Sequence, residues 1–502
     1  ALPRFAPTST LRYPALLGSL LACLVLTRSD PVKVFYILPT RAWELLAGGL
    51  VFFCVNRIDL GVRGRRLLEG VGLALIILAI VLFDMSSVWP GWRAAVPVLG
   101  GCLVILAQRE SSLFTGSPVA QWLGERSYSI YLWHWPLVVG LVYLERAGDP
   151  LWIAGGLLVT VLLGHMSFRW VERPSQRYLS RCSTRRALTS LIILLLIVIV
   201  AAQVVRRNGV PSRLPEAIAS IEAERQNRNP RQDECLSADS SCIYGGEKVE
   251  AILLGDSYAD AVVTAFQAAV PAPDMGIYFK GESACLIVFG ARSQRGVEDA
   301  CSRLREQLKA SLATTWPDKP VVIVNRTSFY AFGGVAGDTD QPPGRPLVDF
   351  STHYATPEPA FLAEFRQEYL ATACAIAATR PLYLVRPIPE MHESVPNAMG
   401  RALLLGKEKI IAVSRADYEQ RNQFIWQLQD EASKQCGVRI LDPLPYLCDE
   451  KFCYGSKSGR PLYADGTHLS EHGNRLLVPM FEKVFQANAS EAVLPAEPAV
   501  HQ

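Results

Sequence analysis

Seven apolar stretches without a charged residue, all within the first 205 residues, limit the possible folds of this chain most strongly. They cover residues 13–27, 45–56, 70–83, 94–108, 127–144, 150–168 and 187–205. A helix needs about 20 apolar residues to cross a bilayer, so the shorter stretches would need polar flanks or neighbouring helices. Core helices of a large soluble protein are the alternative. So many closely spaced stretches favour an all-α polytopic membrane bundle of six spans, followed by a seventh span.

Charge is distributed unevenly along the 502 residues. Residues 1–205 hold 19 Lys and Arg against 10 Asp and Glu, whereas the remaining residues hold 31 against 37. If residues 169–186 are cytoplasmic, the loops on the inside carry 14 Lys and Arg and those on the outside carry five. Because positive loops stay inside, we expect a multi-pass protein of the bacterial inner (cell) membrane with its C-terminal domain in the periplasm. The acidic second half argues against nucleic-acid binding.

Eight of the 12 cysteines lie in the second half, and an even number in an exported domain indicates disulfides. Eight cysteines allow 105 connectivities. Proximity favours Cys235–Cys242 and Cys448–Cys453, whereas Cys285–Cys301 and Cys374–Cys436 are guesses by elimination, because the sequence does not fix the pairing. A zinc site is the alternative, but no C-x2-C pair with a matching second pair is present. We therefore expect no metal.

Polar residues within the apolar half form three clusters, and such residues are costly inside a membrane. Arg41 and Glu44 are three positions apart and can pair on one helix face. Tyr131 and His134 lie among aromatic residues of one span, and Glu172 follows another span. Each could be structural, since Trp and Tyr favour membrane interfaces and an Arg–Glu pair can hold two helices together.

Taken together, these clusters resemble the membrane acyltransferase-3 family over roughly residues 10–180. The matching motifs are R-x-W-E-L-x-x-G from Arg41, S-Y-S-I-Y-L-W-H-W-P-L from Ser127 and V-E-R-P from Val171. The resemblance implies an integral membrane protein that moves acyl groups, usually acetyl, from cytoplasmic acyl-CoA towards extracytoplasmic sugars. The family's N-terminal spans have no match here, so we expect this sequence to be a fragment of a longer protein.

The second half alternates short apolar runs with helix-like segments. The runs are 251–254, 276–279, 321–324, 382–385 and 438–441, and the main helix-like segments are 297–313, 358–378, 415–435 and 470–487. This alternation predicts a parallel sheet covered on both faces. We expect a partial membrane domain at 1–180, a linking span at 187–205, a linker at 206–245 and a periplasmic domain at 246–490.

Two motifs in this domain carry chemistry. Gly255-Asp256-Ser257 lies where a strand gives way to a helix, so the serine hydroxyl would be exposed at a helix N-terminus. A plain N-cap is the alternative. Asp465-Gly466-Thr467-His468 precedes the last helix. A histidine there could accept the serine proton, and a carboxylate could orient the imidazole.

These two motifs, in this order, resemble the SGNH hydrolase superfamily over about residues 249–488. The resemblance implies a three-layer α/β/α (flavodoxin-like) fold with a triad of Ser257, His468 and Asp465. It also implies oxyanion donors at the Ser257 N–H, at Gly281 and at Asn325.

The two halves together resemble a known fusion of acyltransferase-3 and SGNH domains that O-acetylates envelope polysaccharides such as lipopolysaccharide O-antigen. The implied partners are the lipid bilayer and an envelope polysaccharide acceptor, with acetyl-CoA as the donor and no bound cofactor. Two alternatives stay open: a periplasmic carbohydrate esterase with the same triad, and a non-catalytic polysaccharide-binding membrane protein.

Overall fold

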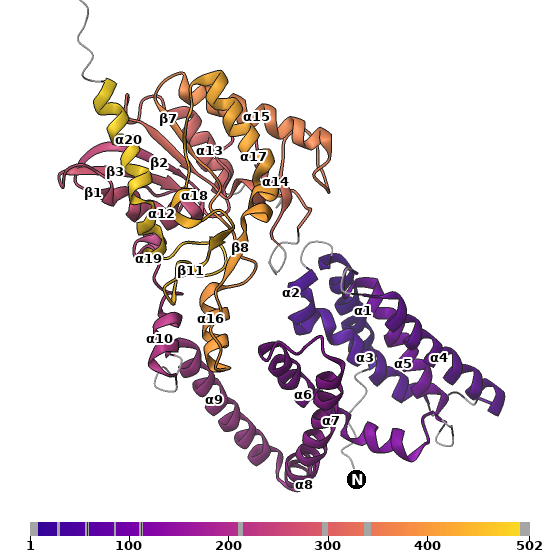
Figure 1. Ribbon diagram of the computed structural model, residues 1–502. Helices are drawn as coiled ribbons and strands as arrows, with labels where there is room; N and C mark the ends of the chain where they lie inside the picture. The colour runs from indigo at the N-terminus through magenta and orange to yellow at the C-terminus, as the bar shows by residue number, and fades with distance from the viewer. Residues whose placement is uncertain are drawn as a thin grey trace, which may run out of the picture. The chain divides into compact units, whose positions relative to one another are not determined.

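The chain divides into two compact units, Ala1–Ser190 and Leu191–Gln502 (Figure 1). The computed structural model describes residues 9–27, 31–55, 58, 60–84, 87–109, 112, 114–208, 214–293, 300–335 and 343–491. The first unit is helical, and the second contains the sheets.

Most of each of the seven apolar stretches lies in one helix of the structure, and two further short helices lie between stretches. The helices are α1 (Ser9–Leu26), α2 (Pro31–Tyr36), α3 (Leu38–Cys54), α4 (Val62–Leu82), α5 (Ala95–Ala107), α6 (Pro118–Tyr143), α7 (Pro150–Ser167), α8 (Arg173–Arg181) and α9 (Thr184–Asn208). Helices α4 and α5 cross at glycines, because a Cβ on Gly72 would lie 2.7 Å from the Gly100 oxygen. Such close helix approach through small residues is typical of membrane bundles.

The helical nature of this unit is confirmed, but the predicted number of spans is not. Among the described residues, only Pro150–Arg181 and Thr184–Arg207 are helices long and apolar enough to cross a membrane. Helix α3 has 17 residues and α5 has 13, below the roughly 20 that a bilayer requires. Helices α4 and α6 contain charged residues in their N-terminal halves, which shortens their apolar parts.

The second unit is built on a six-stranded sheet in the order β1-β3-β2-β5-β7-β9. The strands are β1 (Cys242–Gly245), β2 (Lys248–Gly255), β3 (Met275–Gly281), β5 (Val321–Val324), β7 (Leu382–Val385) and β9 (Arg439–Leu441). Strands β3, β2, β5, β7 and β9 pair in parallel, each with the next. The prediction of a wholly parallel sheet is wrong at one edge, because β1 pairs antiparallel with β3. The sheet is therefore mixed.

Helices cover both faces of this sheet, giving three layers (Figure 1). Alternate residues of β2 point to opposite faces. Leu253 packs in the core with α12 (Ser257–Ala268) and α20 (Val478–Glu491). Leu254 packs in the other core with α13 (Ala300–Ser311), α15 (Pro359–Ala377) and α17 (Arg415–Cys436). The long apolar runs of the strands follow from this two-sided burial.

Eight cysteines of this unit form four disulfides, which include the two pairs favoured by proximity and the two pairs guessed by elimination. They are Cys235–Cys242, Cys285–Cys301, Cys374–Cys436 and Cys448–Cys453. The Cys374–Cys436 bond joins α15 to the end of α17 and closes the longest loop of the four, with a sequence separation of 62. The sheet and its covering helices are thus cross-linked at several points, as suits an oxidising compartment.

The segment expected to be a linker contains ordered elements of this unit. Helices α10 (Glu216–Ala223) and α11 (Gln232–Cys235) precede β1. Helix α10 packs on α16 (Val395–Leu404). The Glu471 N–H donates to the Asn227 carbonyl at 2.8 Å. This segment therefore belongs to the folded body and reaches the loop before α19 (Glu471–Asn474).

Candidate active site

The turn from β2 into α12 places Ser257 at the carboxyl edge of the sheet. A Cβ on Gly255 would lie 1.8 Å from the Val324 oxygen of β5, so only glycine allows the two strands to approach this closely. The Asp256 carboxylate accepts from the Tyr258 N–H at 2.9 Å and caps the helix. Ser257 is the first residue of α12, where a backbone N–H has no acceptor within the helix.

Three side chains form a continuous hydrogen-bonded chain at this edge. Ser257 Oγ lies 2.8 Å from His468 Nε2, and His468 Nδ1 lies 2.9 Å from Asp465 Oδ2. Serine and histidine are 211 positions apart in the sequence. The Tyr258 ring meets the imidazole edge-on, with centroids 5.2 Å apart. This geometry is that of a nucleophile, a base and an orienting carboxylate.

The Asp465 carboxylate is held on several sides. Its Oδ1 accepts from the N–H groups of Thr467 at 2.7 Å and His468 at 2.8 Å. Burial alone would raise the pKa of Asp465, but the hydrogen bonds from His468 and Thr467 and the charge of the imidazole outweigh it. The pKa of Asp465 is therefore well below its ordinary value, and the group stays a carboxylate. The Val395 N–H donates to the backbone carbonyl of Asp465 at 3.1 Å, which joins the loop that carries Asp465 to α16.

Arg228 is a site residue that the sequence analysis did not identify. Its Nη2 donates to Asp465 Oδ2 at 2.8 Å, so arginine and histidine share one carboxylate oxygen. The pair is partly exposed, with 35% of the Arg228 side chain accessible. Arg228 lies in the segment that had been interpreted as a linker, 237 positions from its partner. No local motif could have revealed it.

Asp256, next to the nucleophile, is fully buried and binds two further elements. Its Oδ2 accepts from the Arg326 N–H at 3.0 Å and the Tyr330 hydroxyl at 2.8 Å. Burial raises the pKa of Asp256, against these hydrogen bonds. The side chain thus joins the β2–α12 turn to the residues that follow β5, and it holds Ser257 in place.

The two expected oxyanion residues occupy neighbouring strand ends. Gly281 pairs with Gly255 in the β3–β2 register, and Asn325 directly follows Val324, which pairs with Gly255 on the other side. The Asn325 amide, however, donates to the Cys285 carbonyl at 2.9 Å and accepts from the Ile287 N–H at 3.1 Å. Both ends of this amide therefore hold the loop after β3, and no described hydrogen bond joins it to Ser257. The oxyanion role of both residues stays a prediction.

The candidates in the first unit lie in three separate places. Arg41 and Glu44 pair as expected, with Nη2 2.8 Å from Oε2. His134 stacks on Tyr131 with ring centroids 5.7 Å apart, and both side chains are exposed. Glu172 accepts from Ser129 Oγ at 2.6 Å, which joins the segment after α7 to α6.

Two further polar contacts in this half were missed by the sequence analysis. Arg126 Nε lies 2.9 Å from His165 Nδ1, and Trp122 stacks on the same imidazole at 5.3 Å. Glu69 is buried and pairs with Arg109, 40 positions away. The charged partners in these contacts come from different helices or loops, so spacing along one helix gave no signal.

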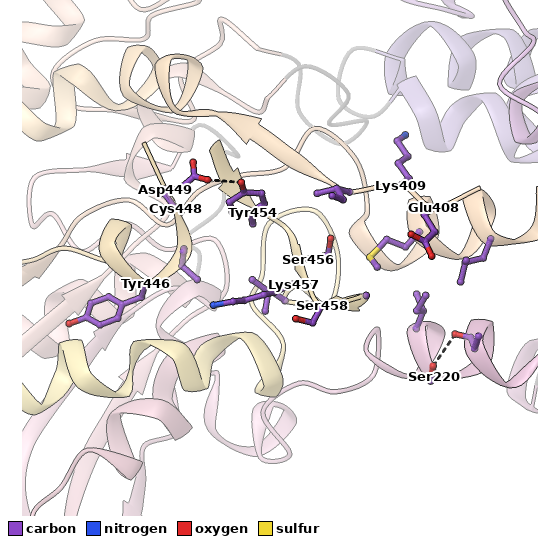
Figure 2. A pocket seen from close by; sticks show the side chains of 18 of the residues that line it. Ser220, Glu408, Lys409, Tyr446, Cys448, Asp449, Tyr454, Ser456, Lys457 and Ser458 are labelled. Atoms are coloured by element: carbon purple, nitrogen blue, oxygen red, sulfur yellow. Dashed lines mark hydrogen bonds between the residues drawn. The ribbon is translucent and has the colours of Figure 1, made fainter. Parts of the chain in front are cut away.

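A pocket of about 930 Å³ in the second unit is not lined by Ser257, Asp465 or His468 (Figure 2). Its walls include Ile221, Met399, Tyr446, Ser456 and Leu462. Triad and pocket share supporting elements, because α16 and the segment before Asp465 contribute to both.

One cluster of described residues has metal-ligand spacing. It consists of Glu234, Cys235 and Cys242. Both sulfur atoms are joined in a disulfide, so they are not free thiolates for a metal ion.

Asp260 lies on α12, the helix that begins with Ser257, and gives the first testable prediction. The side chain is 1% exposed and accepts from Asn229 at 2.5 Å and Gln232 at 2.9 Å. Burial raises the pKa of Asp260 to about 6, although both hydrogen bonds oppose the rise. The folded state therefore binds this proton more tightly than the unfolded chain, whose pKa is near 3.8. The resulting stability is complete below pH ~4 and is lost as the pH rises through ~6.

We expect Asp260→Asn to become more stable relative to the wild type as the pH rises from 4 to 7. The difference between the two free energies of unfolding should change by up to about 3 kcal/mol over this range. Urea unfolding of the second unit within the full-length proteins measures the difference at each pH. The variant also loses a carboxylate oxygen that accepts a hydrogen bond. This loss changes the free energy of unfolding by the same amount at every pH, so it does not affect the pH dependence of the difference. A wild-type-to-variant difference that is constant over this range would contradict the prediction.

Comparison with known families supports the motifs quoted above. The chain matches the family described as SGNH domain (fused to AT3 domains) over residues 225–483, slightly more than half of its length. It matches the acyltransferase domain Acyl_transf_3 over residues 4–170. The resemblance inferred from the sequence is thereby confirmed.

Two curated relatives share part of this sequence. YrhL of Bacillus subtilis, provisionally named a peptidoglycan O-acetyltransferase, is 27% identical over 201 residues, covering 36% of this chain and 32% of YrhL. Peptidoglycan O-acetyltransferase OatA of Listeria monocytogenes is 30% identical over 164 residues, covering 30% of this chain and 26% of OatA. The chain thus spans about a third or less of these relatives.

Among solved structures, the periplasmic domain of a lipopolysaccharide acetyltransferase from Salmonella ser. Paratyphi A aligns with a TM-score of 0.35 and 14% identity. The alignment covers 49% of this chain and 86% of that domain. On the strength of the family match over more than half of its residues, the chain belongs to the family of SGNH domains fused to AT3 acyltransferase domains.

Proposed function

We propose that this protein is an O-acetyltransferase that modifies a bacterial cell-envelope polysaccharide through Ser257. The observation that carries the proposal is the hydrogen-bonded chain from Ser257 through His468 to Asp465, in a protein of the AT3-fused SGNH family. Acyl transfer in two steps needs a nucleophile that can hold the acyl group between donor and acceptor. A serine with a base at 2.8 Å meets that need.

The reaction would take place in two half-steps. In the first, Ser257 Oγ attacks the acetyl carbonyl while its proton passes to His468 Nε2, and the donor's leaving group departs with that proton. In the second, a sugar hydroxyl gives its proton to His468 and attacks the acetyl-serine, which restores the Ser257 hydroxyl. The imidazole is positively charged between the proton transfers, and the Asp465 carboxylate stabilises that charge.

Negative charge develops on the carbonyl oxygen in both half-steps. The Ser257 N–H at the start of α12 would stabilise it, because it has no acceptor within the helix and lies at the positive end of the helix dipole. We include Gly281 as a second donor in the proposal, since it ends the neighbouring strand. The Asn325 amide would have to leave Cys285 and Ile287 to take part.

The acceptor in this proposal is a polysaccharide of the cell envelope. Relatives named for peptidoglycan support that polymer, whereas the motif resemblance pointed to lipopolysaccharide O-antigen as an example. The acetyl donor would be cytoplasmic acetyl-CoA, with the acyl group passed across the bilayer by the membrane half. Arg41, Glu44, Tyr131, His134 and Glu172 remain candidates for that step.

The proposed topology places residues 214–491 in the periplasm of a multi-pass inner-membrane protein. Helix α9 would be the last span, because its apolar side chains are exposed along its whole length and need an apolar surrounding. The Arg-rich segment 169–186 would stay in the cytoplasm. The four disulfides favour an oxidising compartment for the second unit.

Acetyl transfer by the full-length protein tests the proposal. The protein in liposomes would receive p-nitrophenyl acetate with peptidoglycan fragments in one arm and O-antigen polysaccharide in the other. We expect acetylated glycan by mass spectrometry, reduced at least about a thousandfold in Ser257→Ala. Ser311→Ala, a change of an exposed serine on α13, is the matched control.

Each other outcome of this experiment has a defined meaning. Release of acetate without acetylated glycan in either arm would indicate an esterase. Undiminished glycan acetylation in Ser257→Ala would show that the triad serine is not the nucleophile.

Arg228 carries a separate prediction, as a positioning residue for Asp465. Loss of one charge-assisted hydrogen bond costs about 1.5–3 kcal/mol when it is well shielded, and less at a partly exposed site. We therefore expect Arg228→Met to lower kcat by about tenfold with little change in KM, and Arg228→Lys to restore part of it. The control is Arg225→Met, which removes a surface pair with Glu222 three positions away.

A general loss of stability would not be corrected by lysine and would appear equally in the Arg225 variant. If Arg228→Met retained full kcat, the positioning role would be wrong.

A further inference from the structure

The end of α16 and the turn after it, residues 401–410, expose three large apolar side chains to solvent. Among the described residues from 214 to 491, large apolar side chains are exposed at only five positions: Ile243, Leu404, Leu405, Ile410 and Phe452. Three of the five lie in residues 401–410, which we name the α16 tip. Leu404 is 59% exposed and Ile410 is 74% exposed. Exposed apolar side chains gathered in one place mark a contact surface.

The α16 tip is a formed structure rather than a loose end. The Lys407 N–H donates to the Ala402 carbonyl at 2.9 Å, and the Gly406 N–H donates to Leu403 at 3.0 Å. Gly406 has a φ of 67°, the left-handed conformation that ends a helix and turns the chain back. The turn therefore presents the apolar side chains in fixed positions. Figure 1 shows α16 projecting from the sheet beside α10.

The chain length before α10 limits how far this tip can be from the membrane. Helix α9 ends at Asn208 and α10 begins at Glu216, eight positions later. An extended chain covers about 3.5 Å per residue, so these positions span at most roughly 28 Å. Helix α16 packs directly on α10, and Gly400 lies against Ile218 and Glu222. If α9 spans the bilayer, the start of α10 lies at most roughly 28 Å from its outer surface, which leaves the neighbouring α16 within reach of that surface.

Charge at the tip suits a lipid headgroup layer. Lys407 and Lys409 flank the exposed leucines and Ile410, and Arg401 lies one turn earlier. Lys409 is paired with Glu393 at 2.7 Å, and Arg401 is paired with the same carboxylate at 3.1 Å. Glu408 lies within the tip and Glu393 beside it, so the three basic residues leave a net charge of +1. Apolar side chains with a basic border are typical of segments that lie in the membrane interface.

We propose that the α16 tip inserts Leu404, Leu405 and Ile410 into the outer interface of the membrane that α9 crosses. This proposal rests on the proposed topology but not on the proposed chemistry. Docking would hold the second unit in a set orientation, because α16 also binds the Asp465 carbonyl through Val395. The lining of the 930 Å³ pocket includes Leu403, Lys409 and Ile410, so docking would bring this pocket beside the lipid surface.

Photo-crosslinking in the full-length protein tests this contact. Photoreactive p-benzoylphenylalanine would replace Leu404 or Ile410, one at a time, in liposomes of phosphatidylethanolamine and phosphatidylglycerol. The matched control carries it at Ile243, an exposed apolar residue on the edge strand β1. We expect lipid adducts by mass spectrometry at positions 404 and 410, at least about tenfold more than at position 243.

Three outcomes would overturn the proposal. They are no lipid adduct at positions 404 and 410, equal adducts at position 243, and crosslinks to residues 1–190 in place of lipid, which would make the membrane unit the partner. The experiment is repeated in the Ser257→Ala background. If lipid adducts form in both the wild-type and the Ser257→Ala background while neither protein transfers acetyl, the proposed function fails and the membrane docking stands.

Discussion

The close approach of β2 and β5 at Gly255 is the constraint on which the site depends. With no Cβ at this position, the Val324 carbonyl lies where a side chain would begin, and the chain turns directly into α12. Asp256 then caps the helix and binds the residues after β5, which leaves Ser257 at the helix start. The nucleophile is thereby presented on rigid elements, and only the loop that carries His468 must be brought to it.

That loop is held by segments far apart in the sequence. Arg228 comes from the residues that follow the last candidate span, and Val395 comes from the start of α16. Both bind Asp465, so the acidic end of the triad connects to the segment that follows α9 in the chain and to α16, which packs on α10.

Local features of the fold could be predicted from the sequence, whereas long-range contacts could be predicted only where a pair of motifs or the cysteines indicated them. The motif at Gly255 and the motif at His468 encode their own turns, and the strands of the parallel core show as unbroken apolar runs. The antiparallel edge strand β1 is four residues long and has no such signal. Arg228 lies in a polar segment without periodicity, and its role arises from a partner 237 positions away. The Asn325 position followed from the strand order, but the use of its amide by Cys285 depends on a loop whose path the sequence does not show.

The most direct test of the central claim is the detection of an acetyl-enzyme. The full-length protein would be treated with an acetyl donor in the absence of polysaccharide, quenched with acid, digested and analysed by mass spectrometry. The account predicts an acetyl group on Ser257, which disappears when a polysaccharide acceptor is added before quenching. Acetylated polysaccharide formed by a protein whose Ser257 never carries acetyl, even without acceptor, would contradict it.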